Sequence, residues 1–107
     1  MSSSRFGLSD SDFKFILDSF SSDPSIESLV LFGSRAMGNY KKGSDIDLAV
    51  KSKDAEVHRL ISRIKDKLEN ESPMPYFFDI VHYESLDNAK LQKHIDECGV
   101  EIFKRLK

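Results

Sequence analysis

Two segments of the chain carry apolar residues at the spacing of an amphipathic helix. In Ser9 to Phe20 these residues recur at positions i, i+3, i+4 and i+7, which places them on one side of a helix. The same spacing runs through Ala55 to Glu69. The apolar positions are Phe13, Ile16, Leu17 and Phe20 in the first segment and Val57, Leu60, Ile61, Ile64 and Leu68 in the second. A further helix is predicted over Asn88 to Cys98, ending at Gly99.

Shorter apolar runs between these helices predict strands. They are Ile26 to Phe32, Asp45 to Val50 and Tyr76 to His82, and Val100 to Phe103 favours a short edge strand. Arg35 to Gly38 is expected to form a short helical turn. Helical and extended segments therefore alternate, which predicts an α/β (α+β) fold with a small mixed sheet of three to four strands packed against helices.

Composition narrows the class of protein. The chain has 107 residues, enough for a single domain over residues 1–107, with residues 1–8 expected to be a flexible N-terminal arm. The formal net charge of -2 gives no support for nucleic acid as the main partner. Cys98 is the only cysteine, which excludes an internal disulfide and fits a reducing cytoplasm. No apolar run approaches the roughly 20 residues that span a bilayer, so no membrane association is expected.

Asp45 and Asp47 are the first candidates for chemistry. They lie two residues apart on a predicted strand, so both carboxylates project from the same face. Two like charges at that distance call for a cation, and oxygen-only ligands suit Mg²⁺. Taken alone, however, this pattern more often marks two solvent-exposed acids on the polar side of an edge strand.

Gly33 and Ser34 follow directly after an apolar strand. Glycine lets the backbone turn sharply and approach a ligand closely, and the serine hydroxyl with nearby amides can bind phosphate oxygens. By itself this pair is more often an ordinary turn. The combination of a strand, Gly-Ser, ten residues and Asp-x-Asp on a second strand is far more specific than either part.

The stretch LFGSRAMGNYKKGSDIDLAV, Leu31 to Val50, resembles the signature of the minimal nucleotidyltransferases (MNT) of the DNA polymerase β superfamily. Every position of the pattern is filled, by Phe32, Gly33, Ser34, Asp45 and Asp47. The surrounding residues of the small members also match, at Arg35, Ala36, Gly38, Ser44, Ile46 and Leu48. The resemblance implies the nucleotidyltransferase fold, with a palm-like sheet.

The resemblance also implies a third carboxylate on a later strand. Asp79 is the only acid centred in the apolar third strand, where an unpartnered charge is costly. The family then implies that Asp45, Asp47 and Asp79 are the catalytic and metal-binding residues for one or two Mg²⁺ ions. The resemblance further implies that Asp79 accepts the proton of the attacking hydroxyl.

The nucleotide site implied by the resemblance consists of Gly33, Ser34 and Arg35, with Ser34 and its neighbouring amides on the β and γ phosphates of ATP or another nucleoside triphosphate. Lys41 and Lys42 lie near the site in sequence, although a loop lysine is more often simply solvated.

The acceptor is suggested only by the kind of relative. Small MNT proteins resemble the antitoxin of two-gene systems, in which AMP from ATP is transferred to a tyrosine of a HEPN-domain toxin. The resemblance thus implies a protein adenylyltransferase with a HEPN toxin as partner. Two alternatives remain open: a non-catalytic module that neutralises a helical partner by contact, and a stand-alone nucleotidyltransferase for a small molecule or RNA.

The remaining reactive or aromatic residues are interpreted as structural. His58 and His94 lack metal-ligand spacing and are expected on the surface or facing a partner. His82 is expected to be structural, and the pair Phe77-Phe78 is expected in the core, although paired rings also occur where bases stack.

Overall fold

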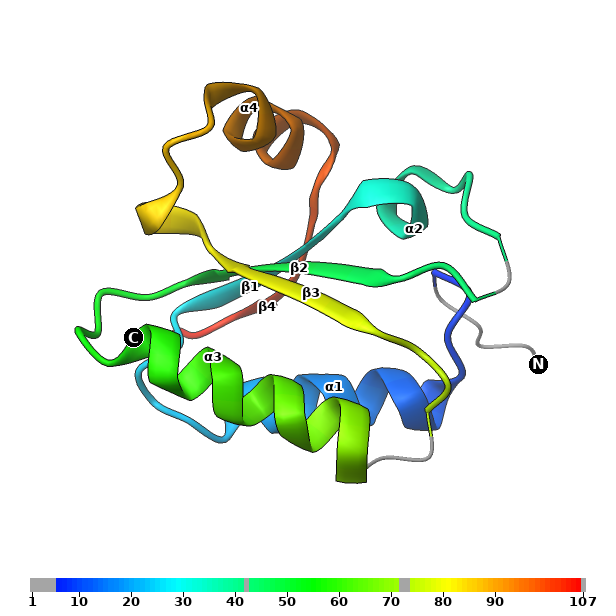
Figure 1. The fold of residues 1–107 in the computed structure, drawn as a ribbon, viewed down its shortest axis with the longest axis horizontal. Helices are drawn as coiled ribbons and strands as arrows, with labels where there is room; N and C mark the ends of the chain where they lie inside the picture. Colours follow the sequence, from blue (N-terminus) through cyan, green and yellow to red (C-terminus); the bar gives the residue numbers. More distant parts are fainter. Residues whose placement is uncertain (1–5, 42, 72–73, 107) are drawn as a thin grey trace.

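The centre of the computed structural model, which describes residues 6–41, 43–71 and 74–106, is a four-stranded sheet in the order β3-β2-β1-β4 (Figure 1). Strand β1 pairs antiparallel with β2 and β4, whereas β2 and β3 run parallel. The strands are β1 (Ser28–Phe32), β2 (Ile46–Lys51), β3 (Phe78–His82) and β4 (Val100–Lys104). The helices are α1 (Asp10–Ser21), α2 (Gly33–Met37), α3 (Val57–Asp66) and α4 (Ala89–Cys98). No helix within these ranges is long and apolar enough to cross a membrane.

Helices α1 and α3 cover one face of the sheet, and the larger core lies between them and the strands (Figure 1). Helix α1 begins after Ser9, whose hydroxyl accepts a hydrogen bond from the Asp12 amide at 3.1 Å. The predicted apolar stripes of both helices supply this core, together with alternate residues of β2. Ile46, Leu48 and Val50 of β2 all belong to it.

Helices α2 and α4 lie on the opposite face (Figure 1). The apolar cluster here is smaller and consists of Val30, Phe32, Ala49 and Ile95, with partly buried neighbours. Because this layer is thin, polar residues that point to the same face of β2 and β3 remain accessible to solvent. One face of the sheet is therefore fully covered by helices, whereas the other leaves polar side chains of β2 and β3 accessible to a ligand.

The predicted fold class is confirmed, including the mixed sheet and the extra edge strand, which is β4. One helix differs at its end. Helix α3 ends at Asp66, and Lys67–Glu71 continues as a π-helical turn in which Leu68 stays buried. Within this turn the Glu69 carboxylate accepts a hydrogen bond from the Phe78 amide at 2.8 Å, which ties the turn to β3.

Residues 6–8 pack against the domain. Leu8 is buried in the larger core, and the Phe6 carbonyl accepts a hydrogen bond from the Arg35 guanidinium at 2.8 Å. Residues 6–8 are thus held by a buried apolar side chain and a hydrogen bond, whereas the flexible arm expected over residues 1–8 stays a prediction. Residues 1–5 lie outside the described residues.

Gly99, which follows α4, is required by close packing. Its backbone is extended, with φ -73° and ψ 155°, so no left-handed conformation is involved. A Cβ atom at this position would overlap with the Ile95 carbonyl oxygen and with the Val30 side chain. The glycine thus lets the chain leave α4 and enter β4 directly against β1.

Candidate active site

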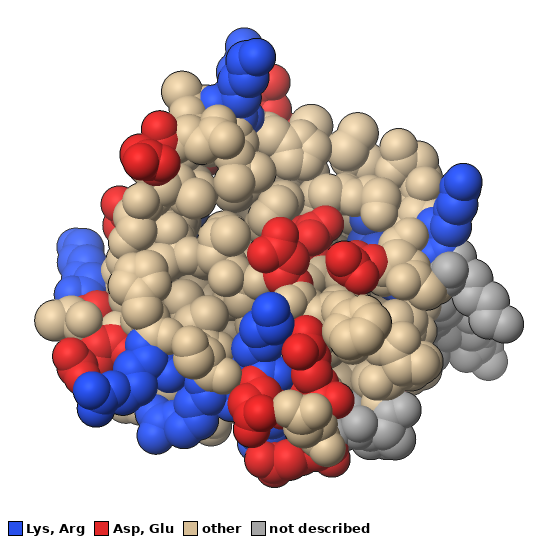
Figure 2. Space-filling model, viewed as in Figure 1, with Lys and Arg blue, Asp and Glu red and all other residues tan. Residues whose placement is uncertain are grey.

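Asp47 and Asp79 are direct neighbours across strands β2 and β3. The parallel register places Asp47 opposite Asp79, next to the pair formed by Ile46 and Phe78. Because side chains alternate across a sheet and Ile46 faces the larger core, both carboxylates leave the opposite face. Asp45, two residues before Asp47, follows the same alternation. Figure 2 shows acidic atoms gathered over the middle of the molecule, where β2 and β3 run in Figure 1.

No lysine or arginine among the described residues forms an ion pair with these three carboxylates. The lack of an ion pair affects Asp47 most, because this residue is half-buried. Burial raises the pKa of the Asp47 carboxyl, and the charges of Asp79 and Asp45 raise it further. The site therefore concentrates negative charge that the described part of the protein does not neutralise.

This negative charge fits a divalent metal ion whose coordination is completed by oxygen atoms of a substrate. Among the described residues, no three His, Cys, Asp or Glu side chains converge as a closed metal centre. Mg²⁺ needs less than that, because it is commonly held by one or two carboxylates, with phosphate oxygens and water in the other positions. Two adjacent, unpaired aspartates with a third nearby match this requirement.

Gly33 stands at the end of β1, next to the acids. Its φ of +75° lies in the left-handed region that favours glycine. The β1–β2 register pairs Phe32 with Asp47, and a Cβ atom on Gly33 would overlap with the Asp47 carboxylate. Both the backbone conformation and the space left by Asp47 therefore require glycine here.

Ser34 follows Gly33 at the start of helix α2 and is half-buried. Its carbonyl accepts hydrogen bonds from the Gly38 and Asn39 amides at 3.0 and 3.2 Å, which closes the short helix. Within the part of the chain that the structure describes, the Ser34 hydroxyl has no hydrogen-bond partner. It remains available to a ligand beside Asp47.

Arg35 makes its contacts inside the protein, and its assignment to the nucleotide remains a prediction. Only 2% of the residue is exposed, and its guanidinium donates to the Ser44 carbonyl at 2.9 and 3.1 Å as well as to Phe6. The guanidinium also lies 4.7 Å from the centre of the Tyr76 ring and 5.2 Å from that of Tyr40. These contacts hold it below the surface.

His94 lies closer to the site than its position in the sequence indicated. The His94 ring packs edge to face against the Phe32 ring, with centroids 6.1 Å apart. A positive charge on His94 lowers the pKa of Asp47, whereas burial and the other two acids raise it. Leu91 and Ile95 pack inward from α4, so His94 lies at the flank of that buried side. Helical spacing alone places His94 beside the apolar side of α4, but it does not show that this side lies near Asp47.

The other residues considered from sequence lie apart from the acids or outside the described residues. Lys41 is exposed, and Lys42 is not among the described residues. The His58 and His82 rings meet edge to face at 5.3 Å, and His82 contacts the Ser52 carbonyl at 2.7 Å, in keeping with a structural role. Phe78 is in the core as expected, but Phe77 is exposed.

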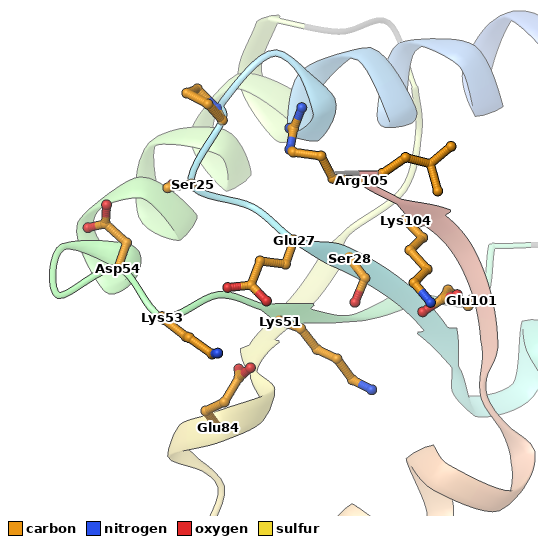
Figure 3. A pocket seen from close by; sticks show the side chains of 12 residues that line it. Ser25, Glu27, Ser28, Lys51, Lys53, Asp54, Glu84, Glu101, Lys104 and Arg105 are labelled. Carbon is orange, nitrogen blue, oxygen red and sulfur yellow. The ribbon is translucent and has the colours of Figure 1, made fainter.

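A cavity among the described residues is at the other end of the sheet. It measures about 780 Å³ and is lined by residues such as Lys51, Lys104 and Glu84 (Figure 3). Lys51 and Lys104 are the last residues of β2 and β4, whereas Asp47 lies near the start of β2. The side chains that line this cavity carry both signs of charge, unlike the acidic site. The candidate active site is therefore assigned to the carboxylates and not to the cavity.

Comparison with solved structures supports the same fold. A chain of a toxin–antitoxin crystal structure with AMP-PNP superposes with a TM-score of 0.70 at 22% identity, covering 92% of this chain and 75% of that one. A tri-AMPylated Shewanella oneidensis HEPN toxin in complex with its MNT antitoxin gives 0.66 at 20%, covering 88% and 71%. A nucleotidyltransferase described as putative, from Sulfolobus solfataricus, gives 0.52 at 22%, covering 87% and 77%. At these identities the likeness concerns the fold.

Comparison at the level of sequence is decisive for the family. A search of curated proteins found no significant match. The family model described as polymerase beta, nucleotidyltransferase, matches residues 14–107, which include both strands of the Gly-Ser and Asp-x-Asp pattern and the strand of Asp79. With this match over most of its length, the chain belongs to the polymerase β nucleotidyltransferase family.

Proposed function

We propose that this protein transfers AMP from ATP to a tyrosine hydroxyl of a helical HEPN-type toxin and thereby acts as its antitoxin. The observation that carries the proposal is the pair Asp47 and Asp79 beside the Gly33-Ser34 turn, with no lysine or arginine of the described chain forming an ion pair with the acids. Family membership supplies the class of reaction. The similar folds crystallised with AMP-PNP and with an AMPylated HEPN toxin suggest the nucleotide and the partner.

The triphosphate would lie over β1 and β2. Ser34 and the first amides of α2 would bind its terminal phosphate oxygens, because those amides precede the first helical hydrogen bonds. Gly33 leaves the space that the Asp47 carboxylate needs at this point. Asp45 and Asp47, with Asp79, would hold Mg²⁺, which when bound supplies neutralisation of the triphosphate charge.

The acceptor would approach from the side of β3. The tyrosine oxygen forms a bond to the α-phosphorus while the bond between that phosphorus and the α,β-bridging oxygen breaks, so that pyrophosphate leaves. The hydroxyl proton passes to the Asp79 carboxylate, which is exposed and adjacent to Asp47. Positioning and charge neutralisation carry most of the acceleration in such a transfer.

The direct test is transfer of label. The purified protein is mixed with the purified product of the adjacent gene, Mg²⁺ and ATP labelled on its α-phosphate, and label is expected on that partner. ATP labelled on the γ-phosphate should leave the partner unlabelled, because the β and γ phosphates depart together. Asp47→Asn and Asp79→Asn should each lower the rate about a hundredfold or more while leaving a folded protein.

Asp18→Asn provides the matched control. It removes an exposed acid on α1, on the far side of the sheet, and should transfer at the normal rate. Neutralisation of the toxin that survives Asp47→Asn and Asp79→Asn, without label, would establish the contact-only alternative instead. Label on RNA or a small hydroxyl compound in the absence of the partner would establish a stand-alone enzyme.

A further inference from the structure

Phe77 is an exposed aromatic ring at the edge of the acidic site. Its exposed fraction is 71%, whereas that of the adjacent Phe78 is 2%, so the expectation that both rings are core is wrong for Phe77. A phenyl ring is among the side chains that gain most from leaving water. Its position beside charged residues therefore needs an explanation other than folding.

The backbone of Phe77 is held although its ring is free. Its carbonyl accepts a hydrogen bond from the Ile46 amide at 3.0 Å, which extends the β2–β3 pairing by one residue. Alternation along the strand places the Phe77 ring on the same face as Asp79. Continuing the parallel register places it opposite Asp45. The ring is thus a fixed apolar element within the row of acids.

The order of the strands decides which substrate meets this ring. Gly33 and Ser34 follow β1, whereas β3 is an outer strand of the sheet, with β2 between them. A triphosphate bound at Gly33-Ser34 and Asp47 therefore lies on the inner side of Asp79. Phe77 precedes β3, the strand of Asp79, and is separated from Gly33-Ser34 by the width of β2. It therefore lies on the side of Asp79, the residue proposed to take the proton of the attacking hydroxyl.

We infer that Phe77 is a docking contact for the acceptor protein and receives an apolar side chain that flanks the acceptor hydroxyl. This inference rests on the proposed function and specifies how its acceptor is recognised. An aromatic ring with only two side-chain torsions and a fixed backbone loses little entropy on binding, which is why such rings serve as anchors in interfaces. Phe77 itself takes no part in the chemistry.

The test separates recognition of the acceptor from recognition of ATP. In the α-phosphate transfer assay with the purified neighbouring-gene protein, Phe77→Ala should raise KM for that protein about tenfold, the usual loss for a central aromatic contact. The kcat should stay within about twofold, and so should the Kd for Mg²⁺ with a non-hydrolysable ATP analogue, because neither depends on the docking contact. Phe77→Leu keeps an apolar contact, so its KM should stay close to that of the unaltered protein.

Leu106→Ala is the control, because Leu106 is 86% exposed and lines the cavity at the other end of the sheet. A weaker Kd for the ATP analogue in Phe77→Ala would overturn the inference and make the ring a contact for the nucleobase. An unchanged KM with normal transfer would overturn it while leaving the proposed function intact. Absence of transfer by the unaltered protein would remove both, and thermal melting of each variant shows that it is folded.

Discussion

Gly33 and Asp47 share one small space at the end of β1. The glycine has φ +75°, and any side chain on it would overlap with the carboxylate, so the two residues depend on each other. Asp47 in turn is half-buried beside two other acids, and no lysine or arginine of the described chain forms an ion pair with it. Such a cluster lowers the stability of the metal-free protein, which is the usual consequence of assembling charge for binding.

Replacing Asp47 by Asn should therefore stabilise the metal-free protein at neutral pH. Burial and the neighbouring acids raise the pKa of Asp47 above 3.8, so the ionised folded state is penalised. The penalty is absent well below pH 3.8, where both states are protonated, and is complete above the raised pKa. Removing it should raise Tm by about 2–4 °C, the shift that about 0.5 kcal/mol produces in a small domain.

Thermal melts in EDTA across pH 3 to 8 measure this effect. The difference in Tm between Asp47→Asn and the unaltered protein should grow as the pH rises. Mg²⁺ with an ATP analogue should reverse it, because only the unaltered protein gains binding energy. A variant that melts lower than the unaltered protein in EDTA at neutral pH would show that Asp47 has a stabilising partner in the folded state.

The connection between α1 and β1 shows how a short polar segment is held. Asp23 accepts hydrogen bonds from the Ser25 hydroxyl at 2.6 Å and from the Ser25 amide at 2.9 Å, and these bonds lower its pKa. Arg105, after β4, donates to the carbonyls of Ser21 and Asp23 at 3.0 and 2.9 Å. The turn thus joins the first helix to the last described residues of the chain.

Asp23 should make stability depend on acid pH in the opposite sense to Asp47. Its contribution is complete above pH 3.8, the ordinary value for aspartate, and is lost as the pH falls through the lowered folded pKa. The unaltered protein should thus be more stable than Asp23→Asn at neutral pH, by about 0.3–1 kcal/mol, since the carboxylate is largely solvated.

Urea unfolding at pH 7 and at pH 2.5 measures the Asp23 contribution, with the exposed Asp87→Asn as control. The difference between Asp23→Asn and the unaltered protein should be smaller at the lower pH. A difference of equal size at both values would mean that the loss comes from altered packing and not from the charge.

Arg35 connects three distant parts of the molecule. Its guanidinium bonds to the Phe6 carbonyl before α1 and to the Ser44 carbonyl before β2, and it packs on the Tyr76 ring before β3. Ser44 directly precedes Asp45, so these contacts hold the chain next to the acids. Arg35 therefore supports the site from beneath, as a positioning residue.

Arg35→Met should destabilise the whole domain. It leaves two carbonyls without their donors and removes the ring contacts, for which a loss of about 2–4 kcal/mol is typical. Exposed Arg59→Met is the matched control and should change stability by less than about 0.5 kcal/mol. An unchanged Tm for Arg35→Met combined with a large loss of affinity for the ATP analogue would instead support the assignment of Arg35 to the nucleotide site.

The sequence by itself was sufficient for the elements and for the family. Apolar residues at helical spacing, as in α1 and α3, predict their own structure because the pattern is local. The Gly-Ser and Asp-x-Asp spacing likewise lies within one continuous stretch, so it can be recognised without knowing the fold. Asp79 could be predicted as the third acid because the family resemblance implies one on a later strand and Asp79 is the only acid centred in the apolar third strand.

Only the tertiary structure decided what surrounds these residues. The burial of Arg35, the approach of His94 to Asp47 and the exposure of Phe77 each depend on segments far apart in the chain that meet in the sheet. The same holds for residues 6–8, which Leu8 anchors in a core formed by later elements. Local pattern indicates which side of a helix or strand is apolar, but what that side faces depends on the packing of the other elements.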